Sequence, residues 1–223
     1  MTASSAERCV IGIFAKAPHP GLAKTRLIPS LGEDGAAALH ARLVERTVAT
    51  AQAARAGEVQ LWCSPDEQHS FFQSLSLRSG CLLLRQCEGD LGRRMAGAVD
   101  RMLCDASFAI IVGTDCPALT PDDLRLARDS LAGGCDAVLG PAEDGGYYLI
   151  GLRRPRPRIF DSIDWGSDRV LEQTAVRLRS LRLRWRELAV HWDVDRPQDV
   201  DRLRRDPTLH TLLTGGLSAA PSA

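Results

Sequence analysis

Seven short segments with the pattern of strands alternate with longer segments of helical periodicity, and this alternation most constrains how the chain can fold. The strand segments lie at residues 9–15, 59–63, 81–84, 108–113, 136–140, 147–152 and 184–192. Most are apolar throughout, which is typical of strands that are buried on both faces of a sheet. Strands that alternate with helices favour a three-layer α/β/α fold with a mostly parallel sheet and right-handed crossovers.

The intervening segments carry the signals of helices. The clearest is Thr120-Pro121-Asp122-Asp123, which combines an N-cap threonine, proline at the first helical position and acids in the first turn. Apolar spacing predicts further helices over residues 35–54, 91–103 and 167–179, and a shorter one within 65–74. On the first of these helices we expect His40 to lie on the wetter side.

The length of 223 residues fits a single domain over residues 1–223. We expect its core at about residues 9–205 and a C-terminal tail at 206–223, whose last part, 215–223, is too small and polar to be ordered without help. No stretch approaches the roughly 20 apolar residues that span a bilayer, and the N-terminus lacks the apolar region of a secretion signal. A cytoplasmic protein is therefore expected.

Charge and cysteine content favour a small-molecule partner. The 28 basic and 28 acidic residues cancel, so no net field attracts the chain to nucleic acid or to a membrane. The seven cysteines form no C-x-x-C pair, and we expect them to be reduced and mostly buried. The oligomeric state is left open.

The loop after the first predicted strand, residues 16–26, has the composition of a phosphate-binding loop. Its prolines stiffen the backbone, and Lys16, Lys24 and Arg26 supply cations that suit phosphate oxygens. The alternative is a solvated basic turn. Neither Walker A nor G-x-G-x-x-G occurs, which disfavours a P-loop kinase and a Rossmann dehydrogenase. The residues assigned to nucleotide binding are Ala15, Lys16, Pro18, Gly21, Lys24, Thr25 and Arg26, with Asp90, for which N-capping of a helix is the alternative.

Two acids that follow predicted strands are the candidate metal ligands. Asp115 ends the fourth strand within Gly113-Thr114-Asp115-Cys116-Pro117, and Asp195 follows the last strand. Ligands of α/β sheets bind at the carboxyl ends of strands, where such acids can bridge a hard cation to phosphate. Mg²⁺ or Mn²⁺ is therefore the expected cofactor. For each acid, capping of the following turn or helix is the alternative.

An acidic, glycine-rich turn and a later acid and tryptophan complete the candidate site. Asp144 precedes two glycines that permit unusual dihedral angles, as acceptor-binding loops often require, and a hairpin turn is the alternative. We assign Asp144 to catalysis together with Lys24 and Arg26. The residues assigned to the acceptor are Gly145, Gly146, Tyr147, Asp164 and Trp165, although Trp165 can equally be a packed aromatic.

Taken in order, these motifs make the chain resemble the DUF2064 family of the glycosyltransferase-A (GT-A) superfamily, also called the rSAM/selenodomain-associated transferase 1 family. The resemblance covers about residues 9–204 and implies a GT-A (nucleotide-diphospho-sugar transferase) fold, a nucleotide or nucleotide-sugar ligand and a divalent cation. Some members are labelled arsenosugar-biosynthesis glycosyltransferases. The matching motifs are Phe14-Ala15-Lys16-Ala17-Pro18, Pro20-Gly21, Lys24-Thr25-Arg26-Leu27, Gly89-Asp90-Leu91-Gly92, Gly113-Thr114-Asp115-Cys116-Pro117, Gly140-Pro141, Asp144-Gly145-Gly146-Tyr147-Tyr148, Asp164-Trp165 and Asp193-Val194-Asp195.

One departure from the GT-A pattern keeps two reactions open. Many GT-A glycosyltransferases hold their metal with Asp-x-Asp, whereas this chain has the single acid of Thr114-Asp115-Cys116. That pattern, with Asp195 before Pro197, is similar to sugar-nucleotide and molybdopterin-type nucleotidyltransferases and to phospholactate guanylyltransferase. We expect a metal-dependent, nucleotide-using transferase, with glycosyl transfer from a nucleotide-diphospho-sugar to a small-molecule acceptor as the first hypothesis. Nucleotidyl transfer with release of pyrophosphate is the alternative, and a catalytically silent nucleotide-sensing module is the third.

Overall fold

A computed structural model describes residues 7–214, and the expectation for residues 215–223 lies outside this range. The strands are β1 (Cys9–Lys16), β2 (Glu58–Ser64), β3 (Leu82–Arg85), β4 (Phe108–Gly113), β5 (Ala137–Pro141), β6 (Tyr147–Leu152) and β7 (Trp185–Glu187). The helices are α1 (Ile28–Ala54), α2 (Ser70–Ser79), α3 (Leu91–Met102), α4 (Pro121–Ala132), α5 (Val170–Ser180), α6 (Pro197–Arg205) and α7 (Thr211–Thr214), with 3-10 helices η1 (Thr25–Leu27) and η2 (Pro157–Phe160).

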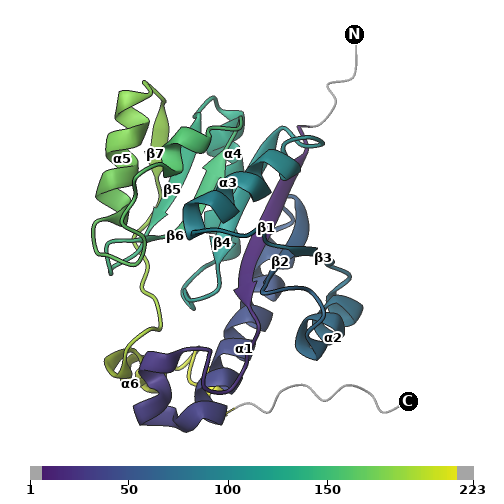
Figure 1. Cartoon of the computed structure of the whole chain (residues 1–223), viewed down its shortest axis with the longest axis vertical. Coiled ribbons are helices and arrows are strands. Elements are labelled where there is room, and N and C mark those ends of the chain that lie inside the picture. Colours follow the sequence, from purple (N-terminus) through teal and green to yellow (C-terminus); the bar gives the residue numbers. More distant parts are fainter. Residues whose placement is uncertain (1–6, 215–223) are drawn as a thin grey trace.

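The strands form one seven-stranded sheet in the order β3-β2-β1-β4-β6-β5-β7 (Figure 1). β6 runs antiparallel to both β4 and β5, and every other neighbouring pair is parallel. The predicted mostly parallel sheet is therefore confirmed. Because β5 and β6 are antiparallel neighbours, the turn that holds Asp144 and Gly145 joins a hairpin, as the alternative for that segment stated.

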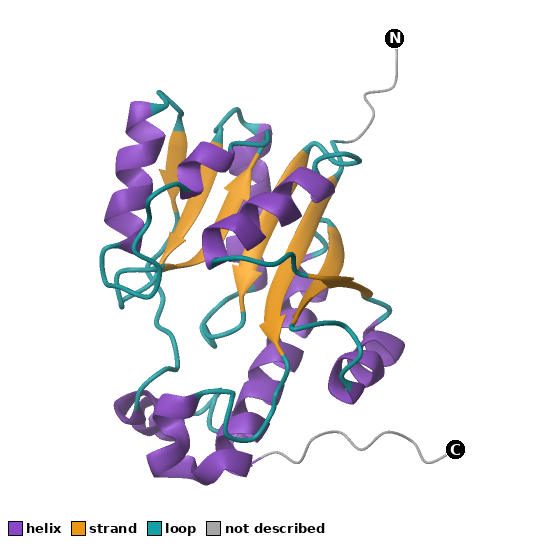
Figure 2. Ribbon diagram, viewed as in Figure 1, coloured by secondary structure: helices purple, strands orange, loops and turns teal. Residues whose placement is uncertain are grey.

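Helices cover both faces of the sheet and make the three expected layers (Figure 2). One face is covered by α1, α2 and α4, which bury side chains such as Val48, Phe72 and Leu124. The opposite face is covered by α3, α5 and η2, with Met95, Leu178 and Ile159 among the buried residues. Both faces are apolar, so the continuous apolar runs of the central strands are satisfied on each side. No helix in the described part of the chain combines the length and the apolar character needed to cross a bilayer.

A third apolar cluster joins the start of α1 to the C-terminal helices, beyond the carboxyl ends of the strands (Figure 1). Trp192 and Val194 belong to it, and so do Leu209 and Leu212, which are buried. The packed part of the chain therefore continues to at least residue 212, past the expected boundary at 205. The spacing of Leu209 and Leu212 was too short a signal to identify α7 from sequence.

Several element ends differ from the expected positions. α1 begins at Ile28 instead of residue 35. The chain bends at Gly32, whose φ of 71° is not helical, so a short helical segment precedes the bend and the long part of α1 follows it. The short helix expected within 65–74 is α2, displaced to Ser70–Ser79. β7 spans three residues only, and the rest of the expected strand contributes a single bridge between Ala142 and His191.

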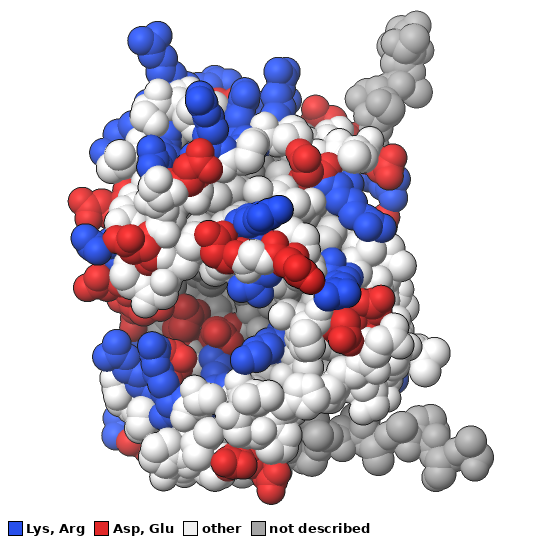
Figure 3. Space-filling model, in the orientation of Figure 1, with Lys and Arg blue, Asp and Glu red and all other residues white. Residues whose placement is uncertain are grey.

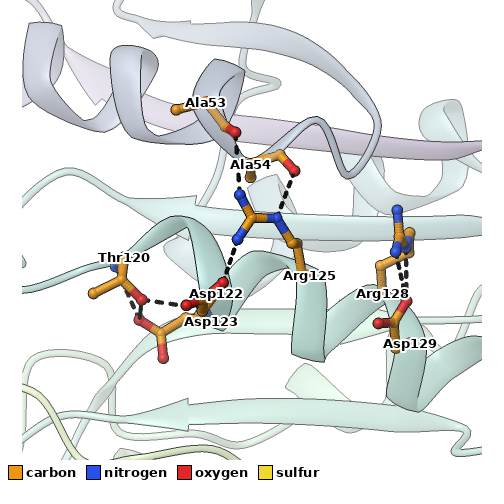
Figure 4. A network of polar contacts seen from close by, with 8 residues as sticks. All are labelled: Ala53, Ala54, Thr120, Asp122, Asp123, Arg125, Arg128 and Asp129. Atoms are coloured by element: carbon orange, nitrogen blue, oxygen red, sulfur yellow. Dashed lines mark hydrogen bonds and ion pairs between the residues drawn. The ribbon is translucent and has the colours of Figure 1, made fainter.

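The predicted start of α4 is confirmed in detail, and it shows how α4 is held against α1 (Figure 4). Thr120 Oγ1 accepts a hydrogen bond from the Asp123 amide at 3.2 Å, and the Asp123 carboxylate accepts one from the Thr120 amide at 2.9 Å. From the same helix, Arg125 Nε donates to the Ala54 carbonyl at 3.1 Å. A guanidinium at the C-terminus of α1 satisfies carbonyls that the helix itself leaves unpaired.

Candidate active site at the carboxyl ends of the strands

A cavity of about 730 Å³ opens where β1, β2 and β4 end. Figure 3 shows a hollow in this face that is bordered by acidic and basic side chains. Of the residues predicted for the site, the cavity is lined by Ala15, Lys16, Lys24, Thr25, Arg26, Asp115 and Asp195. The fold thus brings the basic loop and both candidate metal ligands together, although 80 residues or more separate them in sequence.

Internal hydrogen bonds shape the basic loop. Lys16 Nζ donates to the Leu22 carbonyl at 2.9 Å, and the Ala23 amide donates to the His19 carbonyl at 3.0 Å. Gly21 has a φ of 76°, and a Cβ there would lie 3.4 Å from the Glu33 carboxylate, so glycine allows the turn. Gly21 and Pro18 shape this loop from outside the cavity wall. These contacts give the loop a defined conformation, and its assignment to phosphate binding remains a prediction.

Lys24 occupies the centre of the site. Its Nζ lies 2.7 Å from Asp115 Oδ1 and also donates to the Val194 carbonyl. The lysine side chain is 4% exposed, whereas that of Asp115 is 50% exposed. Burial alone would raise the pKa of Asp115, but the charge and the hydrogen bond of the Lys24 ammonium oppose burial and hold that pKa below its usual value. The carboxylate is therefore ionised and open to the cavity.

A second carboxylate approaches Asp115 from the segment before α6. Burial, followed by the negative charges of Asp115 and Asp144, raises the pKa of Asp193 to about 7. Sequence reasoning had counted Asp193 only as a member of a motif, because nothing in the local pattern indicates which of Asp193 and Asp195 faces inward.

Asp195 pairs with Arg26 across the mouth of the cavity. The alternative that Asp195 caps α6 is wrong, because the N-cap residue of α6 is Arg196, and the Asp199 carboxylate reaches back to accept hydrogen bonds from the amides of Asp195 and Arg196. An acid at the third helical position can reach back to the helix start, and this signal was present in the sequence. Asp195 is thereby left free to face the loop.

Asp144 belongs to the hairpin turn and does not line the cavity. Its negative charge contributes to the raised pKa of Asp193. Its Oδ1 accepts a hydrogen bond from the Gly146 amide at 2.8 Å. Gly145 has a φ of 87°, and a Cβ there would lie 2.0 Å from the Asp168 carbonyl oxygen. Gly145 is therefore required by the turn itself, and the assignment of both glycines to the acceptor remains a prediction.

The remaining acceptor residues are engaged in packing. The Tyr147 hydroxyl is buried and has no hydrogen-bond partner within residues 7–214, and the Tyr147 and Trp165 rings meet edge to face at 6.5 Å. Trp165 also packs on Gly92, where a Cβ would lie 2.8 Å from the indole, so the packed-aromatic alternative is confirmed. Asp164 is paired with Arg169 at 2.6 Å. None of these three side chains lines the cavity.

Asp90 does not line the cavity either, and its assignment to nucleotide binding remains a prediction. The Asp90 carboxylate accepts a hydrogen bond from the Arg93 amide at 2.8 Å and N-caps α3, as the alternative stated. The residues of this helix that do face the cavity are Leu91 and Arg94. In a helix the side chains one and four positions after the N-cap lie on the same face, which here is the face toward the cavity.

His40 lines the cavity, contrary to the expectation that it lies on the wetter side of α1. It is 5% exposed, and its Nε2 lies 2.8 Å from the Lys16 carbonyl oxygen, which ties the end of β1 to the helix. Burial lowers its pKa, so the imidazole is neutral at pH 7. The sequence held a signal, because His40 is one helical turn from both Ala36 and Val44, and both of those are buried.

The donor set of the site fits a divalent cation shared with a ligand. Among residues 7–214, no three His, Cys, Asp or Glu side chains are placed to hold a metal ion by themselves. Mg²⁺ commonly takes one or two carboxylates and completes its shell with water and substrate phosphates. Asp115 and Asp195 line one cavity beside three cations suited to phosphate.

Comparisons with known proteins agree with this architecture. A model of the family described as an uncharacterised protein conserved in bacteria (DUF2064) matches residues 47–167. A candidate nucleotide-diphospho-sugar transferase from Desulfovibrio desulfuricans G20 has 30% sequence identity and a TM-score of 0.79, over 92% of this chain and 94% of that one. No curated protein matches the sequence.

Two more distant structures share the fold. A CMP:2-keto-3-deoxy-manno-octonic acid synthetase in complex with CTP has a TM-score of 0.58 at 13% identity, over 88% of this chain and 97% of that one. Glucosyl-3-phosphoglycerate synthase from Mycobacterium tuberculosis, in complex with Mn²⁺, UDP and glucosyl-3-phosphoglycerate, has a TM-score of 0.54 at 11% identity, over 94% and 80%. One of these proteins handles a nucleoside triphosphate and the other a nucleoside diphosphate, so the fold alone leaves the reaction undecided.

Proposed function

We propose that this chain, which belongs to the DUF2064 family, is a divalent-metal-dependent transferase that acts on a nucleotide. One observation carries the proposal. The chain contains only two lysines, Lys16 and Lys24, and both line the cavity with Arg26, opposite Asp115 and Asp195. Cations beside acids that face a common space suit a phosphate-bearing ligand that shares a metal with the protein.

Each charged residue has a role that follows from its position. Lys16 and Arg26 lie at the exposed side of the loop, where they can bind phosphate oxygens as these enter. Lys24 is almost completely buried, so its charge is poorly screened by water and acts strongly on a phosphate held beside Asp115. Asp115 and Asp195 would hold Mg²⁺ or Mn²⁺, which neutralises charge on the phosphates when it is bound.

Glycosyl transfer from a nucleotide-diphospho-sugar is the reaction that we put first. It is supported by the candidate nucleotide-diphospho-sugar transferase that shares 30% identity over 92% of this chain. In this reaction Lys24 and Arg26 stabilise the charge that develops on the departing nucleoside diphosphate. Asp144, whose charge reaches Asp193, would orient a small acceptor from the hairpin turn.

Nucleotidyl transfer is the second candidate, and the single acid at the end of β4 favours it. Asp115 stands between Thr114 and Cys116, so the Asp-x-Asp of many GT-A glycosyltransferases is absent from this strand end. In this reaction Lys16, Lys24 and Arg26 would hold the pyrophosphate that leaves as a phosphorylated metabolite attacks the α-phosphate. The third hypothesis, a silent nucleotide sensor, predicts binding without consumption.

The released phosphate product separates these reactions. Purified protein is incubated with Mg²⁺ and a pool of small metabolites, together with either nucleotide sugars or nucleoside triphosphates, and the products are resolved by ion chromatography. Release of a nucleoside diphosphate from a nucleotide sugar supports glycosyl transfer, and release of pyrophosphate from a triphosphate supports nucleotidyl transfer. Binding without either product supports the sensor. If calorimetry detects no binding of any nucleotide with Mg²⁺, the proposed function is wrong.

A further inference from the structure

The cavity has a second end, three strands away from Asp115. Gln86 follows β3 and Asp115 follows β4, and β2 and β1 lie between these two strands. At about 4.8 Å for each strand step, the two ends are roughly 14 Å apart. Phe14 and Leu91 add apolar surface to the lining of the cavity, and Lys24 lies beside Asp115 at the other end. If the proposed function is right, phosphates occupy the Asp115 end, and the Gln86 end is left for the base.

The polar groups at this end are held in one orientation. Gln86 is 6% exposed, and its Nε2 donates to the Trp62 carbonyl at 2.8 Å while its Oε1 accepts from Arg94 Nη1 at 3.1 Å. A carbonyl requires the amide nitrogen and a guanidinium requires the amide oxygen, so the Gln86 side chain cannot be flipped. Arg94 Nε also approaches the Asp90 carbonyl, at 3.4 Å. Gln86 therefore positions the Arg94 guanidinium at the cavity wall.

Arg94 presents only donors to the cavity. A guanidinium has five N–H groups, and hydrogen bonds within residues 7–214 use one on Nη1 and the one on Nε. Arg94 has no acidic partner in the described structure, and none of its nitrogens is both buried and unpaired. The oxygen of Gln86, the acceptor nearest to it, is already in use. A ligand edge that meets this wall must therefore offer acceptors.

We propose that Arg94, positioned by Gln86, selects a nucleotide whose base presents two adjacent acceptors, which means guanine or cytosine. Guanine offers O6 and N7 side by side, the pair that arginine binds bidentately in nucleic-acid recognition. Cytosine offers O2 and N3, a pair with the same chemistry. Adenine places an amino donor beside each acceptor of its exposed edges, and uracil places the N3–H donor between its oxygens, so both leave a donor facing a donor.

The test measures the affinity of the four nucleoside triphosphates with Mg²⁺ by calorimetry, for the wild type and for three variants. We expect GTP or CTP to bind about tenfold or more tightly than ATP and UTP. The affinities of GTP and CTP, compared with each other, then identify the base. Arg94→Gln should remove that preference, because glutamine offers one donor and one acceptor and suits adenine. Arg94→Lys keeps the charge and loses the fork, so it should also lose the preference. Arg93→Gln changes the neighbouring exposed arginine, which is outside the cavity wall, and should leave the preference intact.

Two results would overturn the inference while leaving the proposed function standing. One is equal binding of all four triphosphates by the wild type. The other is an equal loss of affinity for all four in Arg94→Gln with retention in Arg94→Lys, which would assign Arg94 to phosphate. If the four triphosphates and the nucleotide sugars all fail to bind with Mg²⁺, the proposed function is wrong and this inference falls with it. Thermal unfolding of each variant confirms that the affinities refer to folded protein.

Discussion

Lys24 and Asp115 form an ion pair in which the cation is buried and the anion is open to the cavity, with side chains 4% and 50% exposed. The pair joins the basic loop after β1 to the end of β4. Because the lysine has lost its water and depends on Asp115 and the Val194 carbonyl for compensation, the carboxylate has a structural role in addition to its proposed metal ligation.

Because Asp115 neutralises a buried lysine, its substitution should affect stability as well as activity. Asp115→Asn leaves the Lys24 ammonium buried without its counter-charge, and we expect a loss of about 1–2 kcal/mol in the free energy of unfolding, a value discounted for the exposure of the carboxylate. Urea denaturation measures this loss. The Lys24→Met/Asp115→Asn double variant should recover most of the stability and none of the metal-dependent turnover. A double variant no more stable than Asp115→Asn would contradict the pairing.

The two lysines provide a direct test of the loop. Lys16 is exposed, whereas the Lys24 side chain is almost fully buried and ion-paired, so amine-reactive reagents should modify Lys16 well before Lys24. Peptide mass spectrometry locates the label without ambiguity, because the only other amine is the N-terminus. A nucleotide with Mg²⁺ should slow the labelling of Lys16, while labelling of the N-terminal amine serves as an internal control. Undiminished labelling of Lys16 at saturating nucleotide would argue against phosphate binding by this loop.

Gly145 should tolerate no side chain, and Gly166 offers the matched control. Both have a positive φ, 87° and 86°, but a Cβ at Gly145 would lie 2.0 Å from the Asp168 carbonyl oxygen, whereas the space at Gly166 is open within 4 Å. Gly166→Ala should cost about 1 kcal/mol from backbone strain alone, and Gly145→Ala about 3 kcal/mol or more, because the clash adds to the strain. Denaturation curves measure both values. Equal losses in the free energy of unfolding for the two variants would show that the turn at Gly145 adjusts to the added methyl group.

Thiol reactivity follows burial. Cys87 and Cys104 are exposed, whereas burial raises the pKa of Cys9, Cys63 and Cys116 to about 12. A raised pKa keeps these thiols protonated below about pH 11, and only the thiolate reacts readily. We therefore expect two of the seven cysteines to react fast with a thiol reagent at pH 8 in the native protein, and all seven in denaturant. Rapid native reaction of Cys63 or Cys116 would show that the core opens readily.

Local sequence patterns predicted helices, strands and loops well where a pattern is typical of one kind of structure only. The Thr120 capping box, the apolar strands and the basic loop are all found where their patterns place them, since each depends on neighbours within a few residues. Patterns that suit both a structural and a functional role were harder to interpret. Asp90, Asp144 and Trp165 each had a structural alternative, and the structure bears that alternative out for all three.

Three residues owe their place at the site to contacts outside their own helix or strand. Burial, with the charges of Asp115 and Asp144, 78 and 49 positions earlier in the chain, raises the pKa of Asp193. Arg94 owes its orientation to Gln86, and His40 faces the cavity because α1 packs beneath the end of β1. None of these relationships is visible in a window of one helix or one strand.

The sequence by itself determined the alternation of strands and helices and the residue types gathered after the strands, because periodicity and composition are local properties of the chain. Only the tertiary structure decided which of those residues face one another. Parallel strands bring distant loops to one edge of the sheet, and burial there sets the charge of each group by the neighbours it meets. The pairing of Lys24 with Asp115, of Arg26 with Asp195 and of Arg94 with Gln86 follows from that packing.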